Sequence, residues 1–168
     1  MKRVLVIGSG GAGKSTFARR LGSSLRLPVV HLDAHYWNPG WVEPDPQSWS
    51  AAMDQLLLAE RWIIDGNYSG TLPARLAACD TVVFLDLPRW LCLWRVVNRA
   101  LRYRGETRPD MAAGCPEQLT WAFLRWVWGF PTRSRPKVLE LLASQAGGRR
   151  VIHLRSARAV GRFLDRLF

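Results

Sequence analysis

Residues 8–15 carry the strongest chemical signal in the chain. They read G-S-G-G-A-G-K-S and directly follow an apolar run at residues 4–7. In the pattern G-x-x-x-x-G-K-[ST], glycines let the backbone curl so that successive N–H groups point at phosphate oxygens. The lysine then reaches the β- and γ-phosphates of a nucleotide, and the serine hydroxyl ligates Mg²⁺. We therefore predict a site for ATP with Mg²⁺, formed by Gly8, Gly10, Gly11, Ala12, Gly13, Lys14, Ser15 and Thr16.

Three arginines of a predicted long helix form the second signal. Arg95, Arg99 and Arg102 recur at positions i, i+4 and i+7, so they share one helical face. In phosphoryl transfer the negative charge spreads over the equatorial oxygens, and a positioned arginine contributes roughly 10³–10⁵-fold in rate. The alternative is a solvated helix face opposite an apolar stripe, which the spacing alone does not exclude.

Two carboxylates are expected where predicted strands end. Asp33 and Asp65 each follow a short apolar strand. Asp33 is placed to accept the proton of an attacking hydroxyl, although a turn-forming or helix-capping Asp is the alternative. We expect Asp86 to cap the helix that follows it rather than to do chemistry. His31 and His35 bracket Asp33, and core or supporting roles are favoured for them over a metal site.

Strands and helices alternate along the chain. Apolar strands separated by helices are typical of a parallel sheet covered on both faces. Right-handed crossovers then bring the carboxyl ends of the strands, with residues 8–15, Asp33, Asp65 and Asp86, to one edge. The predicted strands span residues 4–7, 28–32, 62–64, 81–85 and 151–154, and the helices 15–25, 47–59, 72–77, 88–103, 116–129, 135–143 and 157–167.

Composition restricts the class of protein. A length of 168 residues suffices for one domain with a full core. Because no run of about 18 apolar residues is present, we expect no membrane partner. Three cysteines in no metal-ligand spacing favour a reducing, cytoplasmic location.

The net charge of +11 comes almost entirely from arginine and leaves two interpretations, nucleic-acid binding or the binding of a polyanionic nucleotide. Residues 34–60 hold no Lys or Arg, whereas residues 89–108 hold six arginines. A generic nucleic-acid face does not need that segregation, so nucleic acid is the less favoured partner.

Several stretches of the chain are similar to the adenylate-kinase-like branch of P-loop kinases, and within it to the small bacterial family called DNA topology modulation protein. They are residues 8–15, 31–33, 62–68, 84–88 with Arg95 and Arg99 downstream, 108–111 and 133–136. The resemblance covers essentially the whole chain. It implies an α/β fold, namely a three-layer P-loop NTPase fold with a five-stranded parallel sheet, helices on both faces and a small helical lid. It also implies ATP-dependent phosphoryl transfer.

The resemblance further implies a division of the single domain, residues 1–168. The acceptor-binding segment would be residues 34–60 and the lid region residues 103–135. Lys14, Asp33, Arg95 and Arg99 would then be the catalytic residues.

Metal and nucleotide roles follow from the same resemblance. Ser15 would bind Mg²⁺ directly, and Asp65 would hold it through water. Arg133 and Arg135 come after an expected turn at residues 129–131, where further arginines of a lid would contact the nucleotide. We expect the lid to be mobile without nucleotide, because residues 105–116 hold Gly, Pro and Asp at turn positions and few large apolar anchors.

The acceptor segment departs from the nucleotide-kinase pattern. Kinases whose acceptor is a phosphate ester usually anchor that phosphate with arginine here, but this segment offers Trp37 and Trp41 in a loop rich in Pro and Gly. Aromatic faces suit a planar or apolar group, although both tryptophans would also serve simply to pack the loop. Arg75, in the next connection, is the remaining candidate anchor for the acceptor.

These observations favour a kinase that phosphorylates an unidentified small molecule through a hydroxyl group, as nucleoside, shikimate and gluconate kinases do. Two alternatives remain, a nucleotide-binding regulator with weak turnover and a DNA-binding protein that influences DNA topology. The sequence identifies neither the acceptor nor the oligomeric state.

Overall fold

A five-stranded parallel sheet forms the centre of the molecule. The computed structural model describes residues 1–145 and 147–167. The strands lie side by side in the order β2-β3-β1-β4-β5. Their bounds are β1 (Arg3–Gly8), β2 (Val29–His31), β3 (Trp62–Asp65), β4 (Thr81–Leu85) and β5 (Arg150–Leu154).

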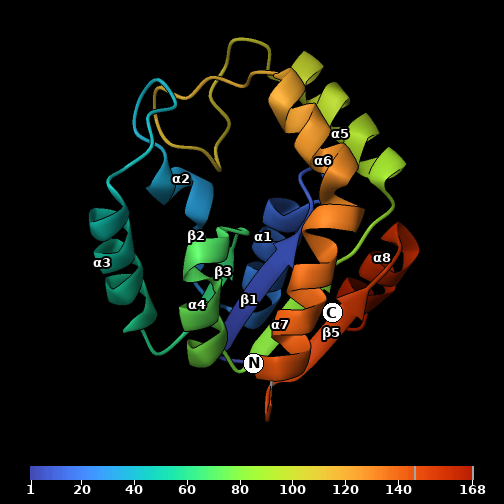
Figure 1. Ribbon diagram of the computed structural model, residues 1–168. Coiled ribbons are helices and arrows are strands. Elements are labelled where there is room, and N and C mark those ends of the chain that lie inside the picture. The colour runs from blue at the N-terminus through green and yellow to red at the C-terminus, as the bar shows by residue number, and fades with distance from the viewer. Residues whose placement is uncertain (146, 168) are drawn as a thin grey trace.

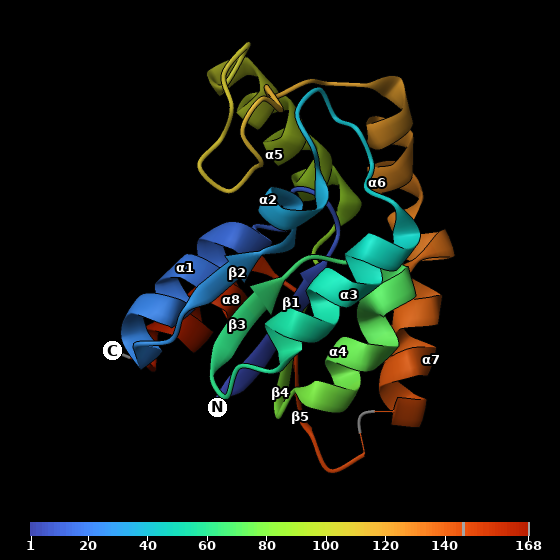
Figure 2. The same ribbon diagram turned by 90° about the vertical axis from the view of Figure 1, so that its left-hand side faces the viewer.

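Helices cover both faces of the sheet, as Figures 1 and 2 show. The helices are α1 (Lys14–Leu25), α2 (Leu32–Tyr36), α3 (Pro46–Leu57), α4 (Leu72–Ala78), α5 (Arg89–Arg102), α6 (Trp121–Arg133), α7 (Arg135–Gln145) and α8 (Ala157–Asp165), with a short 3₁₀ turn η1 (Ser69–Thr71) before α4.

Alternating strand residues build two separate cores. Val4 and Val6 of β1 face α1, α5 and α8, whereas Leu5 and Ile7 face α3, α4 and α7. All four side chains are buried. A strand buried on both sides needs a continuous apolar run, which is what residues 4–7 supply. The predicted three-layer α/β fold is therefore confirmed.

Helix α6 differs from the prediction. A turn was expected at residues 129–131, but the helix continues through Pro131 to Arg133. Val127 packs in one core and Phe130 in the other, so this end of the helix is anchored on both sides. That packing outweighs the hydrogen bond that a proline removes from a helix.

The lid region also differs in detail. Between Tyr103 and Thr120 the structure describes turns and an isolated bridge between Arg104 and Glu117, but no helix. The helical part of the expected lid region is α6, which packs against α5. Residues 105–116 hold one large apolar side chain, Met111, which is buried with Ala112 and Cys115 in a small cluster of their own.

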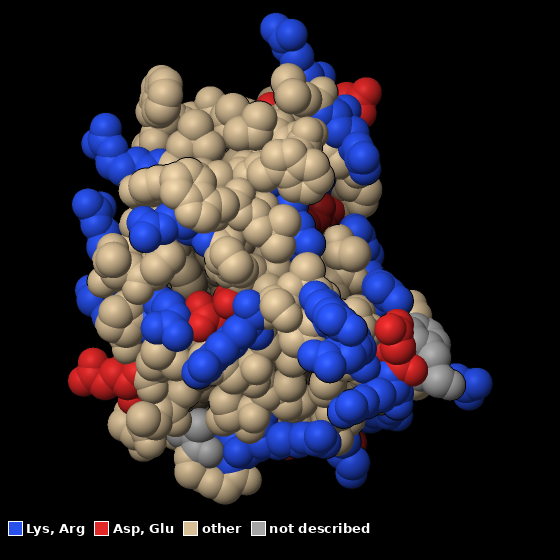
Figure 3. Space-filling view, turned by 90° about the vertical axis from the view of Figure 1, so that its right-hand side faces the viewer, with Lys and Arg blue, Asp and Glu red and all other residues tan. Residues whose placement is uncertain are grey.

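The face formed by α5, α6 and α8 combines apolar and basic side chains. Trp90, Trp94 and Trp121 are largely exposed there. Figure 3 shows Lys and Arg spread over this side of the molecule, with residues that are neither basic nor acidic between most of them. No helix of the described residues is long and apolar enough to cross a bilayer.

Two helical glycines differ in how much space surrounds them. In α1, a Cβ on Gly22 would collide with Val29 of β2 and lie 3.0 Å from the Leu27 carbonyl oxygen. In α8, a Cβ on Gly161 would meet no atom within 4 Å.

The two glycines therefore predict opposite effects of one substitution. Gly161→Ala should raise the free energy of unfolding by up to about 1 kcal/mol, because alanine favours the helix. Gly22→Ala should lower it by about 1–3 kcal/mol, because α1 must move away from β2. Urea unfolding of both variants measures the difference. A stabilised Gly22→Ala protein would show that α1 and β2 are not in close contact.

Candidate functional site

A cavity of about 1080 Å³ lies at the carboxyl edge of the sheet. It is lined by the phosphate loop (residues 8–15) and α1, the segment around α2, the loop after β3, and helix α5. The predicted lid segment before α6 (residues 103–120) and the start of α6 complete the lining. Of the predicted site residues, the cavity collects Gly10, Gly11, Gly13, Lys14, Ser15, Thr16, Asp33, Trp37, Trp41, Asp65, Arg95 and Arg99.

Helices α5 and α6 pack closely against the phosphate loop. Gly11 has a φ of 76°, and a Cβ there would collide with the carbonyl oxygen of Cys92 in α5. On Gly10 a Cβ would lie 2.7 Å from the Phe123 ring of α6. Gly11 therefore requires glycine for backbone conformation as well as for close approach, whereas a side chain at Gly10 would displace the Phe123 ring.

Lys14 is turned onto its own loop. Its Nζ donates to the carbonyl oxygens of Gly8 and Ser9, each at 3.0 Å. Burial lowers the pKa of this amine, while the charges of Asp33 and Asp65 act in the opposite direction. The ammonium group is thus held at the loop by carbonyl dipoles that a phosphate would replace.

Asn67 ties the loop after β3 to the phosphate loop. Its Nδ2 donates to the Gly8 carbonyl at 2.7 Å, and its Oδ1 accepts from the Gly8 N–H at 3.0 Å. This two-point contact fixes the residue at which the phosphate loop begins.

Arg75 supports the same loop from beneath, and its predicted role as an acceptor anchor is wrong. The side chain is fully buried. Its guanidinium donates to the carbonyl oxygens of Gly66, Asn67 and Tyr68. Burial lowers its pKa to about 10. These contacts leave Arg75 outside the cavity, where it acts on the backbone rather than on a ligand.

The two predicted carboxylates each have one protein partner. Asp33, in the first turn of α2, accepts a hydrogen bond of 2.6 Å from the Tyr68 hydroxyl. Asp65 Oδ1 lies 2.9 Å from Nδ1 of His31, which raises the pKa of that imidazole. Tyr68 itself has a φ of 32°, an unusual value for a bulky residue. The backbone strain lies in the loop that Arg75 holds.

The lid segment is joined to α5 by a network of buried charges. Glu117 pairs with Arg99 at 3.0 Å and with Arg108 at 2.6 Å. Arg108 also pairs with Asp110 at 3.0 Å. Burial would raise the pKa of Asp110, but Arg108 and the Ser15 hydroxyl hold it below its usual value. The lid thus reaches the phosphate loop through Asp110.

The arginines predicted for catalysis and nucleotide binding divide into two groups. Arg95 lies against the phosphate loop, 3.4 Å from the Ala12 carbonyl, and Arg99 lines the same cavity. Arg135 instead binds Asp86 at 2.8 Å, and Arg133 is exposed beside Gly129. The structure therefore places neither Arg133 nor Arg135 at the cavity, because α6 continues past the expected turn.

Asp86 does not cap α5, contrary to expectation. The cap position is Pro88, which has no side-chain hydrogen bond. The Asp86 carboxylate binds Arg135 and also lies 2.7 Å from Nε2 of His153, so it joins β4 to β5 and α7.

Trp37 and Trp41 line the cavity beside the predicted lid segment. Their rings meet at 5.3 Å and 67°, and both pack on the Met111 cluster. The Trp41 Nε1–H donates to the Pro116 carbonyl at 3.1 Å. Trp41 has a φ of 63°, which turns the chain sharply at this point.

The residues predicted to hold Mg²⁺ fit the ion. Ser15 and Asp65 both line the cavity. Asp65 Oδ2 is buried and has no hydrogen-bond partner in the described residues, so it is available to accept from a metal-bound water. Magnesium usually keeps several waters and uses few protein ligands, which is the arrangement these two residues allow.

Sequence reasoning did not assign roles to Asn67, Tyr68, Arg108, Asp110 and Glu117. The first two lie in the stretch that carried the resemblance, and residues 108–111 lie in another. Glu117 had no such signal, since its partners are 9 and 18 residues away in sequence.

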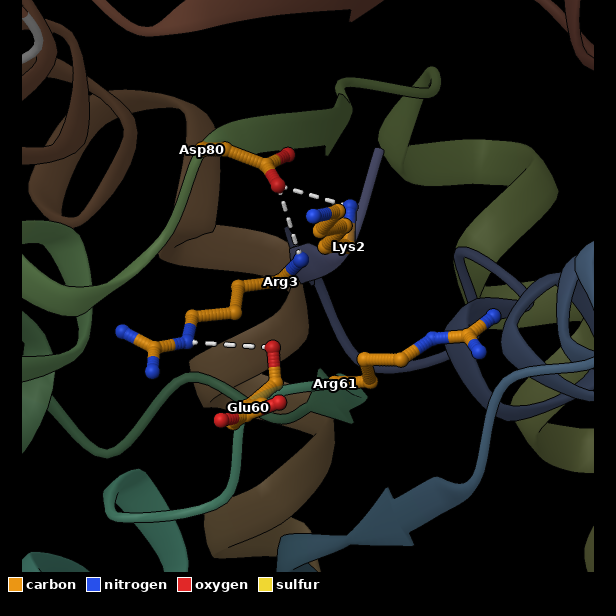
Figure 4. A pocket seen from close by; sticks show the side chains of 5 residues that line it. All are labelled: Lys2, Arg3, Glu60, Arg61 and Asp80. Carbon is orange, nitrogen blue, oxygen red and sulfur yellow. Dashed lines mark hydrogen bonds between the residues drawn. The ribbon is translucent and has the colours of Figure 1, made fainter.

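A second cavity, of about 420 Å³, lies at the other end of β1 and β4. Figure 4 shows that its Asp80 carboxylate binds backbone N–H groups.

Solved structures with the same fold are kinases. Over 99% of its length the chain is similar to shikimate kinase from Acinetobacter baumannii in complex with shikimate, with 17% identity, 90% of that chain covered and a TM-score of 0.60. Shikimate kinase from Bacteroides thetaiotaomicron gives 15%, 95% and 0.53. A gluconokinase from Sinorhizobium meliloti 1021 gives 18%, 93% and 0.50. No family model and no curated protein matches the chain. At these identities the likeness establishes the fold.

Removal of Arg75 should destabilise the protein rather than weaken ligand binding directly. We expect Arg75→Leu to lower the free energy of unfolding by at least about 2 kcal/mol, because it removes the donor of the Gly66 and Asn67 carbonyls. Arg158→Leu, at an exposed position of α8, is the matched control. Denaturant unfolding compares the two, and equal stabilities would contradict the bracing role of Arg75.

Proposed function

We propose that this protein transfers the γ-phosphoryl group of ATP to a hydroxyl group of a small molecule. The observation that carries the proposal is a single cavity that joins the phosphate loop, three arginines of α5 and an accessible carboxylate, Asp33. Structures of the same fold that are named shikimate kinase and gluconokinase support the reaction class. The name of the DNA topology modulation family, which the sequence resembles, describes a phenotype and not a reaction. The proposal supplies a reaction for a protein of that kind.

Each residue has a defined task in this reaction. The backbone N–H groups of the loop and Lys14 hold the β- and γ-phosphates, and Lys14 exchanges its bonds to Gly8 and Ser9 for phosphate oxygens. Arg95 and Arg99 neutralise charge on the transferring group. Ser15 and Asp65 would hold Mg²⁺, which would offset part of the phosphate charge.

Asp33 is the proposed general base. Asp33 belongs to α2 and lines the same cavity as Arg95 and Arg99 of α5. The Tyr68 hydroxyl donates to its carboxylate and holds it in place. Burial raises the pKa of Tyr68, so the phenol stays a hydrogen-bond donor. The second carboxylate oxygen of Asp33 is then free of that contact to accept the proton of the acceptor hydroxyl.

Substitution of the two central groups should separate catalysis from folding. Lys14→Ala and Asp33→Asn should each reduce phosphoryl transfer roughly 10²-fold or more. Asp33→Asn should change ATP affinity little, because Asp33 faces the acceptor. Lys137→Ala and Asp54→Asn, both exposed on other helices, are the controls. Full activity of Asp33→Asn would rule out the base, and full activity of Lys14→Ala would remove the loop from the mechanism.

Metal removal tests the role of Ser15 and Asp65. Addition of EDTA should weaken ATP binding and abolish transfer, and Mg²⁺ should restore both. Asp65→Asn should lower the rate while the melting temperature stays near that of the wild type, since an amide can keep a hydrogen bond to His31. Calorimetry of ATP binding with and without Mg²⁺ gives the measurement. Metal-independent transfer would contradict this assignment.

A further inference from the structure

Aromatic rings form the walls of the cavity on the side of the acceptor segment. Trp37, Trp41 and Tyr68 line it directly. Tyr36 joins them, because its ring lies 5.0 Å from Trp37 at 88° and 4.5 Å from Tyr68. Rings that meet at steep angles present faces in more than one direction.

Carboxylates accompany these rings. Asp33 is bound to the Tyr68 hydroxyl, and Glu43 lines the same cavity. Glu43 is exposed and lies close enough to Tyr36 to raise the pKa of that phenol, together with burial. The combination of aromatic faces and carboxylates attracts positive charge, since a ring quadrupole is negative on its face.

The cations of the cavity belong to other elements. Lys14 and Arg19 come from α1, and Arg95, Arg99 and Arg102 come from α5. Residues 34–60 supply no Lys or Arg.

The remaining two arginines near this end are already committed. Arg108 is buried between Asp110 and Glu117. Arg75, the predicted anchor for an anionic acceptor, is buried under the loop after β3. An acceptor with a carboxylate or phosphate at the aromatic end would therefore lack a counter-charge there, which is costly for a desolvated anion.

We propose that the acceptor is a small amino alcohol, whose ammonium group binds among Trp37, Trp41 and Tyr68 near Glu43 while its hydroxyl faces Asp33. This inference rests on the proposed kinase function and names its substrate class. The structural neighbours are named for kinases of shikimate and gluconate, which carry a negatively charged carboxylate. The acceptor proposed here would carry a positive charge instead.

The reaction balances with the groups already assigned. The acceptor oxygen forms a bond to the γ-phosphorus as the bond from that phosphorus to the β,γ-bridging oxygen breaks. ADP leaves with that bond's electron pair, and the hydroxyl proton passes to Asp33.

Binding experiments test the cationic site independently of turnover. Choline and 3,3-dimethylbutan-1-ol have the same shape but differ in charge, as do ethanolammonium and propan-1-ol. We expect the cation of at least one pair to bind about tenfold or more tightly than its neutral partner, measured by calorimetry and by tryptophan fluorescence. If neither cation is preferred, or if shikimate or gluconate binds more tightly, the proposal is overturned.

Variants locate the site. Trp37→Leu and Glu43→Gln should each remove most of the preference for the cation, and Glu43→Gln should do so without loss of stability because Glu43 is exposed. Trp121→Leu and Glu60→Gln, exposed outside the cavity, should keep the preference. An unchanged preference in both cavity variants would overturn the placement.

A transfer assay with ATP then separates the two proposals. Phosphorylation of the amino alcohol supports both. Cation-selective binding without any transfer supports the cationic site and contradicts the kinase. Transfer only to neutral or carboxylate-bearing acceptors supports the kinase and overturns the cationic site.

Discussion

The guanidinium of Arg75 is the contact on which the arrangement of the site depends. It gathers the carbonyls of residues 66–68, of which that of Tyr68 also accepts from Thr71. With that loop fixed, Asn67 reaches Gly8 and Tyr68 reaches Asp33. A single buried cation therefore sets the position of the phosphate loop relative to Asp33. Because dipoles rather than a carboxylate compensate its charge, burial still lowers its pKa to about 10.

The remaining geometry follows from packing between layers. Helices α5 and α6 lie so close to the phosphate loop that a Cβ at position 10 or 11 would collide with them. Movement of either helix is therefore felt by the loop, since packed interiors transmit displacement. On the other side of the cavity, the Met111 cluster fixes Trp37 and Trp41 against the lid segment. The predicted lid segment connects the two sides of the cavity, because it packs on Trp37 and Trp41 and pairs with Arg99 of α5 through Glu117.

The sequence predicted the sheet and the phosphate loop well because both depend on local signals. Residues 4–7 form a continuous apolar run, and the glycines and Lys14 stand in a fixed spacing. Arg75 and Arg135 were misassigned because an arginine at a helix end has the same local appearance whether it binds a ligand, carbonyls or Asp86. Helix α6 passes Pro131 because tertiary contacts on both sides outweigh local preference. Such outcomes depend on partners distant in sequence, which spacing does not reveal.

The pairing of Glu117 with two arginines has a consequence for the end of the reaction cycle. Its two oxygens hold Arg99 and Arg108. A phosphate that takes Arg99 leaves this carboxylate displaced but still attached to the same lid, at a high effective concentration near the guanidinium. In the proposed reaction, departure of the phosphate is then an intramolecular exchange of one anion for another, and the half-buried Arg99 keeps a counter-charge. The return of Glu117 to its two arginines would be the last step of that proposed cycle.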